Sequence, residues 1–253
     1  MRVIKVGGRV QEDPALADAL ARAWTAAPGA TCVVHGGGDA VSALQRAMGG
    51  EPSFIAGRRV TSARDLDLVR MAVSGAANKR LVSQLVGAGI AAIGISGEDG
   101  GLIGARAIDA ERWGRVGAPS VVQAAMLRHL LAGGYLPVIS PLARDLGRAD
   151  GGPLNVNGDD AAAAIAVALD ATELLLVSDV DGVLLDGAPV RTLDAERACA
   201  AVASGAAHGG MAAKIDAAVR ALDAGVAVVR IGGIGMLTGS APGTSLARAQ
   251  VAA

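Results

Sequence analysis

RVIKVGG, residues 2–8, is a short apolar run that ends in two glycines, and TCVVHGGG, residues 31–38, repeats the pattern. A buried strand that ends in glycine leaves backbone N–H groups open at the edge of a sheet, because no Cβ keeps an anion away. In the first stretch Lys5 adds a positive charge at the same place. The two stretches therefore predict a phosphate-binding edge, although the Walker sequence G-x-x-x-x-G-K-[ST] occurs nowhere in the chain.

Strand-length and helix-length segments alternate along most of the chain, which predicts an α/β fold with a largely parallel sheet covered on both faces. The predicted strands are 2–6, 31–35, 90–95, 135–139, 174–178 and 227–231. The predicted helices are 15–25, 40–48, 65–73, 79–86, 121–131, 160–169, 194–203 and 211–224. Residues 101–119 are expected to form a hairpin with short β pieces, and the glycine-rich, charged segment 144–152 is the expected border between two lobes. Open sheets of this kind bind ligands at the carboxyl ends of their strands.

Composition excludes several classes of partner. Aromatic residues make up 2% of the 253 residues, and the formal net charge is −1, so we expect neither a base-stacking surface nor a basic surface for nucleic acid. Cys32 and Cys199 lie in apolar surroundings without metal-type spacing, which predicts buried, reduced thiols in a cytoplasmic protein. No leader precedes Lys5, and no apolar run reaches the roughly 18 residues of a membrane span, so we expect no membrane partner.

Two lysines lie where a nearby anion would explain them. Lys5 stands at a strand end, where a lysine that simply reaches solvent is an equal alternative. Three glycines at 36–38 precede a helix, so N–H groups and the positive end of the helix dipole face the same space. Lys214 lies in the first turn of a predicted helix, where its charge opposes the dipole unless an anion is close. His35 is expected to be a packed strand residue and not a catalytic base.

Further polar residues gather at other predicted strand ends and helix starts. Arg58 and Arg59 lie on a possible β-hairpin, where neighbours point to opposite faces, so at most one of them faces a site. The guanidinium fork suits a carboxylate held at two points, although a surface arginine pair is the alternative. NVNGDD, residues 155–160, places two amides and two carboxylates at a helix start, which is more than a helix cap requires.

Taken together, these segments resemble the amino acid kinase family, and within it the kinases that act on N-acetylglutamate. Nine pieces occur in the family's order over nearly the whole chain: Lys5-Val6-Gly7-Gly8, His35-Gly36-Gly37-Gly38, Gly57-x-Arg59-Val60-Thr61, Gly75-x-x-Asn78-Lys79, Ser96-Gly97-x-Asp99-Gly100, Gly134-Tyr135-x-Pro137-Val138, Asn155-x-Asn157-x-Asp159, Ser178-Asp179-Val180-x-Gly182 and Gly210-Met211-x-x-Lys214. The resemblance implies a three-layer αβα sandwich around a largely parallel open sheet of about eight strands, in two lobes. Residues 1–150 would bind the amino acid and form the dimer, and residues 151–253 would bind ATP.

The implied activity is ATP-dependent phosphorylation of the side-chain carboxylate of N-acetyl-L-glutamate to N-acetyl-L-glutamyl 5-phosphate, in arginine biosynthesis. Mg²⁺ would be bound mainly through the nucleotide phosphates, without a metal site of the protein's own. Lys5 and Lys214 would stabilise the transferring phosphoryl group, and Asp159 would hold both lysines. Acetylglutamate would be bound by Gly37, Gly38, Arg59 and Asn155, with Arg59 on its α-carboxylate. The phosphates and nucleotide would be bound by Gly7, Gly8, Asp179, Val180, Asp181, Gly182, Val183, Leu184, Gly210 and Met211.

The chemistry agrees with these roles. The acceptor carboxylate is already ionised at pH 7, because a free Glu side chain has a pKa of about 4.3, so no general base is needed. Two like charges at about 4 Å repel each other by roughly 4 kcal/mol at an effective dielectric constant of 20. Lysines, N–H groups and Mg²⁺ offset that repulsion, so catalysis would consist of positioning and charge neutralisation.

Some features depart from the family pattern, and some alternatives stay open. Asp160 stands where a glutamine is expected, and residues 206–209 are small and glycine-rich. The chain lacks the N-terminal helical extension of arginine-inhibited relatives, which implies a homodimer without arginine feedback. The alternatives are a sister kinase, such as the carrier-bound aminoadipate kinase of lysine biosynthesis, and a non-catalytic amino-acid sensor on the same scaffold. A Rossmann dehydrogenase is disfavoured, because no strand is followed by G-x-G-x-x-G.

Overall fold

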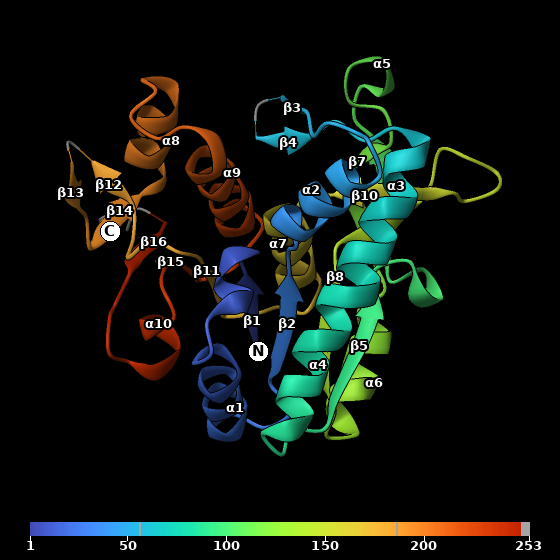
Figure 1. Ribbon diagram of the computed structural model, residues 1–253. Helices are drawn as coiled ribbons and strands as arrows, with labels where there is room; N and C mark the ends of the chain where they lie inside the picture. The colour runs from blue at the N-terminus through green and yellow to red at the C-terminus, as the bar shows by residue number, and fades with distance from the viewer. Residues whose placement is uncertain (56, 186, 249–253) are drawn as a thin grey trace.

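The computed structural model describes residues 1–55, 57–185 and 187–248. Its centre is a sheet of eight strands (Figure 1). The strand order is β14 (Thr192–Asp194), β16 (Thr244–Ala247), β15 (Val228–Gly232), β11 (Glu173–Val177), β1 (Arg2–Val6), β2 (Thr31–His35), β8 (Leu136–Ser140) and β5 (Ala92–Ser96). Neighbouring strands pair parallel except β15 and β16, which pair antiparallel.

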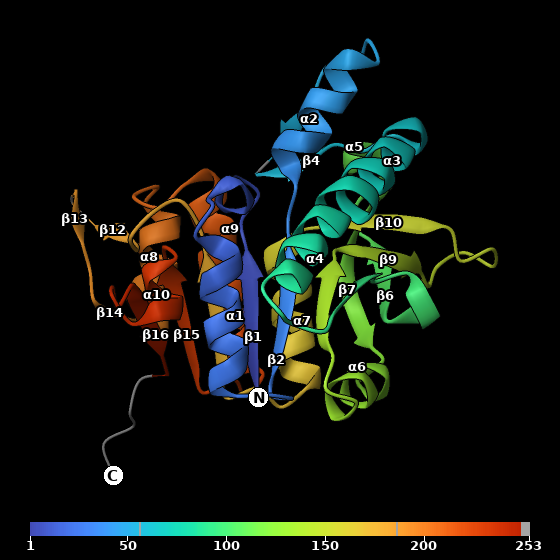
Figure 2. The same cartoon turned by 60° about the horizontal axis from the view of Figure 1, so that its bottom comes forward.

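Helices cover both faces of this sheet (Figure 2). On one face α1 (Leu16–Ala26) contacts both α4 (Asn78–Gly87) and α10 (Gly235–Thr238). On the other face α9 (Gly209–Asp223) contacts α7 (Gly158–Ala168) and α8 (Ala195–Ala203). A further helix, α6 (Ala124–Ala132), packs against β8. The fold is therefore the predicted α/β arrangement with helices on both sides of a mostly parallel sheet of eight strands.

The remaining elements extend the N-terminal half of the molecule. Figure 1 shows α2 (Gly38–Ala47), the hairpin of β3 (Phe54–Ile55) and β4 (Arg58–Arg59), and α3 (Ala63–Val69) above the carboxyl ends of β1 and β2. A small closed barrel consists of β6 (Ile103–Ala107), β7 (Val116–Val122), β9 (Leu142–Asp145) and β10 (Pro153–Val156). The other short elements are α5 (Ala110–Trp113), the 3₁₀ turns Arg9–Glu12 and Asp99–Gly101, and the hairpin of β12 (Leu184–Leu185) and β13 (Ala188–Pro189).

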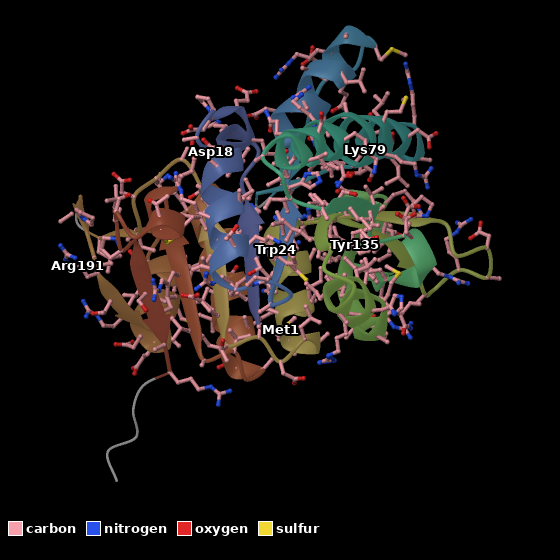
Figure 3. The ribbon with its side chains drawn as sticks, turned by 90° about the horizontal axis from the view of Figure 1, so that it is seen from below. Met1, Asp18, Trp24, Lys79, Tyr135 and Arg191 are labelled. Atoms are coloured by element: carbon pink, nitrogen blue, oxygen red, sulfur yellow. The ribbon has the colours of Figure 1, made fainter. Side chains whose placement is uncertain are left out.

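The larger of two hydrophobic clusters runs through both halves of the chain. The apolar residues of β1 and β2 are completely buried, as strands covered on both faces must be. The main cluster extends from Val3 to Leu246, while Val41, Leu66, Val69, Ala72, Val73 and Leu142 form a smaller cluster. Figure 3 shows Arg191 toward one end of the molecule, Lys79 and Tyr135 toward the other, and Met1 between them.

The central position of β1 places the glycine turns. The strand β1 pairs with β2 from the N-terminal half of the chain and with β11 from the C-terminal half. The strand order changes direction at this point, and open α/β sheets bind ligands at such a switch point, beyond the carboxyl ends of the strands. Gly7, Gly8 and Gly36–Gly38 follow those ends directly, which is where the sequence analysis expects a ligand.

The structure corrects several sequence-based expectations. Residues 121–131 were expected to be one helix, but β7 continues to Val122 and α6 begins at Ala124. The two expected helices 65–73 and 79–86 are one continuous rod, because the π-helix Arg70–Ala77 joins α3 to α4. Cys199 is exposed on α8, in contrast to Cys32, where burial raises the pKa of the thiol to about 12.

Residues 144–152, which were expected to form the border between two lobes, lie at the end of β9 and in its connection to β10. Residues 146–152 connect β9 to β10, and these two strands are antiparallel neighbours in the barrel. A border at residue 150 would therefore separate two paired strands. The hairpin expected at 101–119 is present, since β6 and β7 pair antiparallel.

Candidate active site

The two glycine turns lie against each other at the carboxyl ends of β1 and β2. A Cβ on Gly8 would be 3.4 Å from the amide nitrogen of Gly38 and 3.5 Å from that of Gly37. Among the described residues, the N–H groups of Gly8 and Gly37 donate no hydrogen bond within the protein. Gly38 is the first residue of α2, where N–H groups have no intrahelical acceptor. These amides form a concave group of donors suited to an anion.

Lys5 and Lys214 meet at Asp159, although they are more than 200 positions apart in the sequence. The Lys5 ammonium lies 2.8 Å from Oδ1 of Asp159, and the Lys214 ammonium lies 3.4 Å from Oδ2. All three side chains are largely buried. The lysines come from β1 and from the second turn of α9, and the carboxylate comes from the start of α7. The predicted convergence of the two ammonium groups is therefore present.

The pKa values in this triad reflect burial and mutual charge. Burial alone would raise the pKa of Asp159, but Lys5 and Lys214 outweigh it and lower that pKa, so the carboxylate is ionised. Burial lowers the pKa of Lys214, with a further contribution from Lys5, against the opposing effect of Asp159. Two buried cations share one anion here, so the centre carries an excess of positive charge.

The start of α7 is built to place Asp159. Asn157 caps the helix, and its Oδ1 accepts hydrogen bonds from the N–H groups of Asp159 and Asp160 at 2.8 and 3.4 Å. A Cβ on Gly158 would lie 3.2 Å from Cε of Lys5, so this glycine leaves room for the lysine side chain. Helix capping thus accounts for Asn157, while both aspartate side chains are available for ion pairs.

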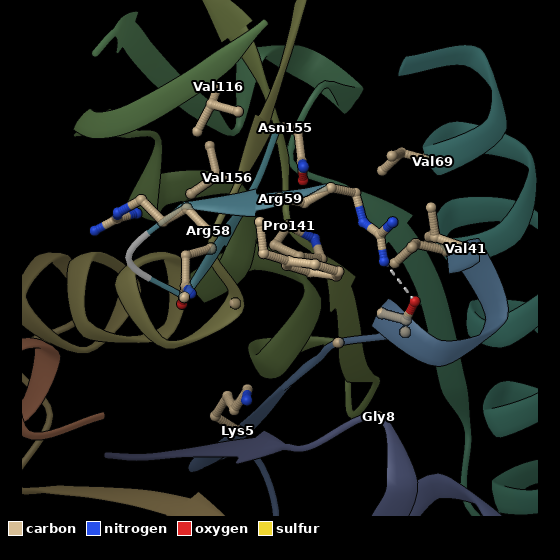
Figure 4. A pocket seen from close by; sticks show the side chains of 18 residues that line it. Lys5, Gly8, Val41, Arg58, Arg59, Val69, Val116, Pro141, Asn155 and Val156 are labelled. Atoms are coloured by element: carbon tan, nitrogen blue, oxygen red, sulfur yellow. Dashed lines mark hydrogen bonds between the residues drawn. The ribbon is translucent and has the colours of Figure 1, made fainter. Parts of the chain in front are cut away.

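Arg59 enters the site from the β3–β4 hairpin and ends beside the glycine turn. Its guanidinium donates to Gly38 O at 2.7 Å (Figure 4). It also donates to Ser42 Oγ at 2.7 Å and Gln45 Oε1 at 2.9 Å, and the ring of Phe54 lies 4.6 Å away. These partners are uncharged, and no carboxylate among the described residues forms an ion pair with it. Burial lowers the pKa of Arg59. A buried guanidinium without a counter-ion is costly, which makes this a place for a ligand carboxylate.

A cavity of about 210 Å³ lies between Lys5 and Arg59 (Figure 4). Its polar lining includes Lys5, Gly8, Gly37, Gly38, Arg59 and Asn155, six of the residues that the sequence analysis assigns to the site. Nδ2 of Asn155 donates to Thr61 Oγ1 at 2.9 Å. The cavity thus has a cationic end at Lys5, a second cationic end at Arg59, and donors between them.

His35 is buried beneath the site, as expected for a packed strand residue. Nδ1 lies 2.8 Å from Gly36 O, and Nε2 lies 3.0 Å from Nδ2 of Asn78. Burial, together with the charges of Lys5 and Lys79, lowers the pKa of His35 to about 4. The ring is therefore neutral at pH 7, donates from Nδ1 and accepts at Nε2.

Apart from Gly8, the residues assigned to the phosphates and nucleotide are not part of the cavity lining, and most of them lie on the side of β11 and α9. Asp179 follows β11 and pairs with Arg9 at 3.0 Å, which lowers the pKa of Asp179. Gly182 lies so close to Thr244 that a Cβ would be 2.6 Å from Oγ1. Val183 is fully buried in the core, and its N–H donates to the same Oγ1.

The other predicted nucleotide residues are more open. Val180, Asp181 and Leu184 are exposed, Gly210 has open space where a Cβ would be, and Met211 is half-buried against the core. Gly7 donates its N–H to Val177 O at 2.8 Å and packs beside Ser178. Oγ of Ser178 is buried and has no hydrogen-bond partner within the described part of the chain.

Sequence reasoning missed several parts of the site. Ser42 and Gln45 hold Arg59, and their spacing on α2 carries no signal of that role. The apolar wall of the cavity comes from five separate elements and includes Val41, Val69, Val73, Val116, Pro141 and Val156. Of Arg58 and Arg59 only Arg59 was assigned a role from the sequence, yet Arg58 forms an ion pair with Asp160 at 2.6 Å. Only the fold brings residues 58 and 160 together.

Comparison with known proteins identifies the family of this chain. The model of the amino acid kinase family matches residues 1–233, almost the whole chain. The chain belongs to the amino acid kinase family. This amino acid kinase is 43% identical to the acetylglutamate kinase of Roseiflexus sp. (strain RS-1), over 90% of this chain and 87% of that one. It is 41% identical to the acetylglutamate kinase of Rubrobacter xylanophilus, over 95% and 93% of the two chains.

Solved structures agree on the architecture. The protein smu.665 from Streptococcus mutans UA159 aligns with this amino acid kinase at a TM-score of 0.86 and 28% identity, over 97% of this chain and 98% of that one. The N-acetylglutamate synthase from Neisseria gonorrhoeae, in complex with coenzyme A and N-acetyl-glutamate, aligns at 0.81 and 27%, over 98% of this chain but 59% of that one. The Giardia lamblia carbamate kinase bound to AMP-PNP, at 0.72 and 14% identity, shares the fold.

Among residues 1–55, 57–185 and 187–248, no three His, Cys, Asp or Glu side chains gather in a way that could hold a metal ion. In the same residues no helix has both the length and the apolar character needed to cross a bilayer.

Proposed function

We propose that this protein transfers the γ-phosphoryl group of ATP to the side-chain carboxylate of N-acetyl-L-glutamate. The observation that carries the proposal is the pair of lysines held by Asp159 at one end of a cavity. At its other end is the guanidinium of Arg59, which forms no ion pair with any carboxylate of the described residues. The relatives named acetylglutamate kinase, at 41–43% identity over nine-tenths of the chain, support the choice of acceptor.

In the proposed reaction an oxygen of the acceptor carboxylate attacks the γ-phosphorus. The bond from that phosphorus to the β–γ bridging oxygen breaks, and ADP leaves with the electron pair. The acceptor is already ionised, so no proton is removed, which agrees with the neutral, hydrogen-bonded state of His35. The barrier is the repulsion between two anions. Lys5 and Lys214 reduce it, with the N–H groups of the glycine turns.

The acceptor would lie in the cavity between Lys5 and Arg59. Its α-carboxylate would pair with the Arg59 guanidinium, which lacks a counter-ion among the described residues, and its side-chain carboxylate would point toward Lys5. Asn155 and the N–H groups of Gly37 and Gly38 would bind the remaining polar atoms. The valines of the cavity wall would contact the methylene and acetyl groups.

The nucleotide would lie on the other side of the lysine pair. The residues proposed to bind it are Gly7, Gly8, Asp179, Val180, Asp181, Gly182, Val183, Leu184, Gly210 and Met211. The buried, unpartnered Oγ of Ser178 is one polar atom there that a phosphate would satisfy. Mg²⁺ fits this donor set only as an ion carried by the nucleotide phosphates, because the buried carboxylate of Asp159 is already shared by two lysines. When bound, Mg²⁺ would neutralise phosphate charge.

We further propose two lobes, one for the acceptor and one for the nucleotide, with their border in the sheet between β1 and β11. The paired strands β9 and β10 would both belong to the acceptor lobe. The protein would be a cytoplasmic homodimer. The sheet ends at β5, and Met71 and Val86 on the adjacent helical rod are each 54% exposed, which supports a face for a second copy. Sedimentation equilibrium tests this: a mass of one chain at micromolar concentration would contradict the dimer.

An acceptor screen with hydroxylamine tests the reaction, because an acyl phosphate yields a hydroxamate. We expect hydroxamate with N-acetylglutamate and ATP, and far less with N-acetylaspartate, glutamate or aminoadipate derivatives. A preference for an aminoadipate derivative would identify a sister kinase. Binding of N-acetylglutamate without any hydroxamate would identify a sensor.

A further inference from the structure

Two adjacent aspartates at the start of α7 each hold two cations. Asp159 pairs with Lys5 and Lys214, and Asp160 pairs with Arg58 and Arg220. The distance from Arg58 to Oδ2 of Asp160 is 2.6 Å, and Arg220 bonds to Oδ1. Asp160 is 7% exposed, so its charge is largely withdrawn from water. The reaction proposed above has no use for this second ion network.

The network joins the part of the fold above the acceptor to the helix that carries Lys214. Arg58 and Arg59 are neighbours on β4, and both line the cavity, but their side chains point in opposite directions (Figure 4). Arg59 reaches toward Gly38, and Arg58 reaches Asp160. Arg220 lies on α9, the helix of Lys214. The hairpin also touches the start of α9, since a Cβ on Gly57 would be 3.2 Å from Gly209 O.

Movement of the hairpin away from the cavity would break the bond between Arg58 and Asp160. The buried carboxylate would then depend on Arg220 alone, whose side chain is 53% exposed. Leaving a buried charge half-paired is costly, so the hairpin and α9 are held in one arrangement by the same carboxylate. An acceptor that draws Arg59 inward also fixes Arg58, because the two residues are consecutive on a short strand.

We infer that Asp160 is a positioning residue that couples the hairpin over the acceptor to helix α9, so that acceptor and nucleotide each strengthen the binding of the other. The inference rests on the proposed function, because it assigns the acceptor to the hairpin side and the nucleotide to the α9 side. Coupling between two binding sites is reciprocal and changes affinities by about 5- to 150-fold in proteins.

The test measures the dissociation constant of N-acetylglutamate by calorimetry, with and without a non-hydrolysable ATP analogue. In the wild-type protein the nucleotide is expected to tighten acceptor binding at least about fivefold. In Asp160→Asn, which keeps the size of the side chain but removes its charge, this ratio falls toward one. The matched control is Asp150→Asn, which removes an exposed carboxylate paired with Arg148, and its ratio stays at the wild-type value.

A second readout reports the hairpin directly. Nε1 of Trp113 donates to Ile55 O on β3 at 3.3 Å, so the fluorescence of Trp113 senses the hairpin. In a Trp24→Phe background Trp113 is the single tryptophan. We expect nucleotide alone to change its emission when Asp160 is present and to leave it unchanged in Asp160→Asn. If Asp160→Asn only made the protein less stable, the affinity ratio and the nucleotide-induced change in Trp113 emission would both stay at the wild-type values.

If Asp160→Asn does not fold, Arg58→Gln and Arg220→Gln replace it. Each single substitution should lower the coupling ratio, and the double variant should lower it no further than the stronger single one, because both act through one carboxylate. A wild-type ratio of one, or variants with the wild-type ratio, would overturn the inference. Absence of hydroxamate formation by the wild-type protein would instead refute the proposed function.

Discussion

Replacement of Asp159 by Asn should destabilise the protein more than any surface carboxylate would. At an effective dielectric constant of about 20, a carboxylate 2.8 Å from one ammonium and 3.4 Å from another gains about 6 and about 5 kcal/mol of Coulomb energy. Desolvation of the three buried charges cancels much of that gain. Removing one partner of a buried pair costs about 3–5 kcal/mol, because the remaining charges stay buried and unpaired.

Urea unfolding of the variant and the wild-type protein measures this difference. We expect a loss of about 3–5 kcal/mol in the free energy of unfolding of Asp159→Asn. Inorganic phosphate should restore part of it, because an anion bound between Lys5 and Lys214 replaces the lost charge and stabilises only the folded state. The matched control is Asp150→Asn, whose pair with Arg148 is exposed and should leave the stability near that of the wild-type protein.

A second variant separates charge from packing. In Asp159→Asn with Lys214→Met, one of the two unpaired cations is removed as well, so stability should recover toward the wild-type value. The reasoning would be refuted if Asp159→Asn unfolded within about 1 kcal/mol of the wild-type protein. It would also be refuted if the double variant were less stable than the single one.

Three further predictions follow from the described contacts. Arg59→Ala should raise KM for N-acetylglutamate roughly 10- to 100-fold, as expected for loss of a charged hydrogen-bond donor, while kcat changes less; steady-state kinetics that show the reverse would contradict the role of Arg59. The pKa of the buried His35 is lowered from 6.5 to about 4. As the pH drops, the unfolded chain therefore binds a proton at this residue before the folded protein does. The free energy of unfolding should fall by about 3 kcal/mol between pH 6.5 and pH 4. His35→Gln should lose that part of the pH dependence in urea titrations, and an unchanged slope would exclude His35 as its source. Gly94→Ala should unfold at lower urea or fail to fold, because its Cβ would lie 2.0 Å from Oδ1 of the buried Asn78; wild-type stability would show that β5 and α4 can separate at little cost.

The sequence predicted the centre of the fold well because its signals there are local. The apolar runs at 2–6 and 31–35 are completely covered strands, and both were predicted with the bounds that the structure has. The predicted bounds of helices and strands were wrong where the hydrophobic pattern departs from the regular helical or strand repeat. The π-helix Arg70–Ala77 widens the helical repeat, so one rod was expected as two helices. The hairpin at 101–119 was predicted, but its second strand β7, VGAPSVV, continues to Val122, whereas 121–122 were expected in a helix.

In the candidate site too, the sequence predicted the residues that carry a local signal and missed those that do not. Lys214 was predictable because a lysine near a helix start conflicts with the helix dipole, and the structure shows its partner in Asp159. The ion pair of Arg58 with Asp160 was not predictable, since neither residue conflicts with its local surroundings and the two are 102 positions apart. Residues that act by filling space, such as Val41 and Val73, carry no chemical signal in the sequence.

The role of Lys214 is the central claim, and one comparison tests it most directly. The rate of hydroxamate formation from N-acetylglutamate and ATP is measured for Lys214→Ala beside the dissociation constant of N-acetylglutamate. Loss of a preorganised cation at a developing charge costs about 100- to 1,000-fold in kcat. We predict a loss of that size with acceptor affinity within a few-fold of the wild-type value. Turnover within a few-fold of the wild-type rate would contradict the account.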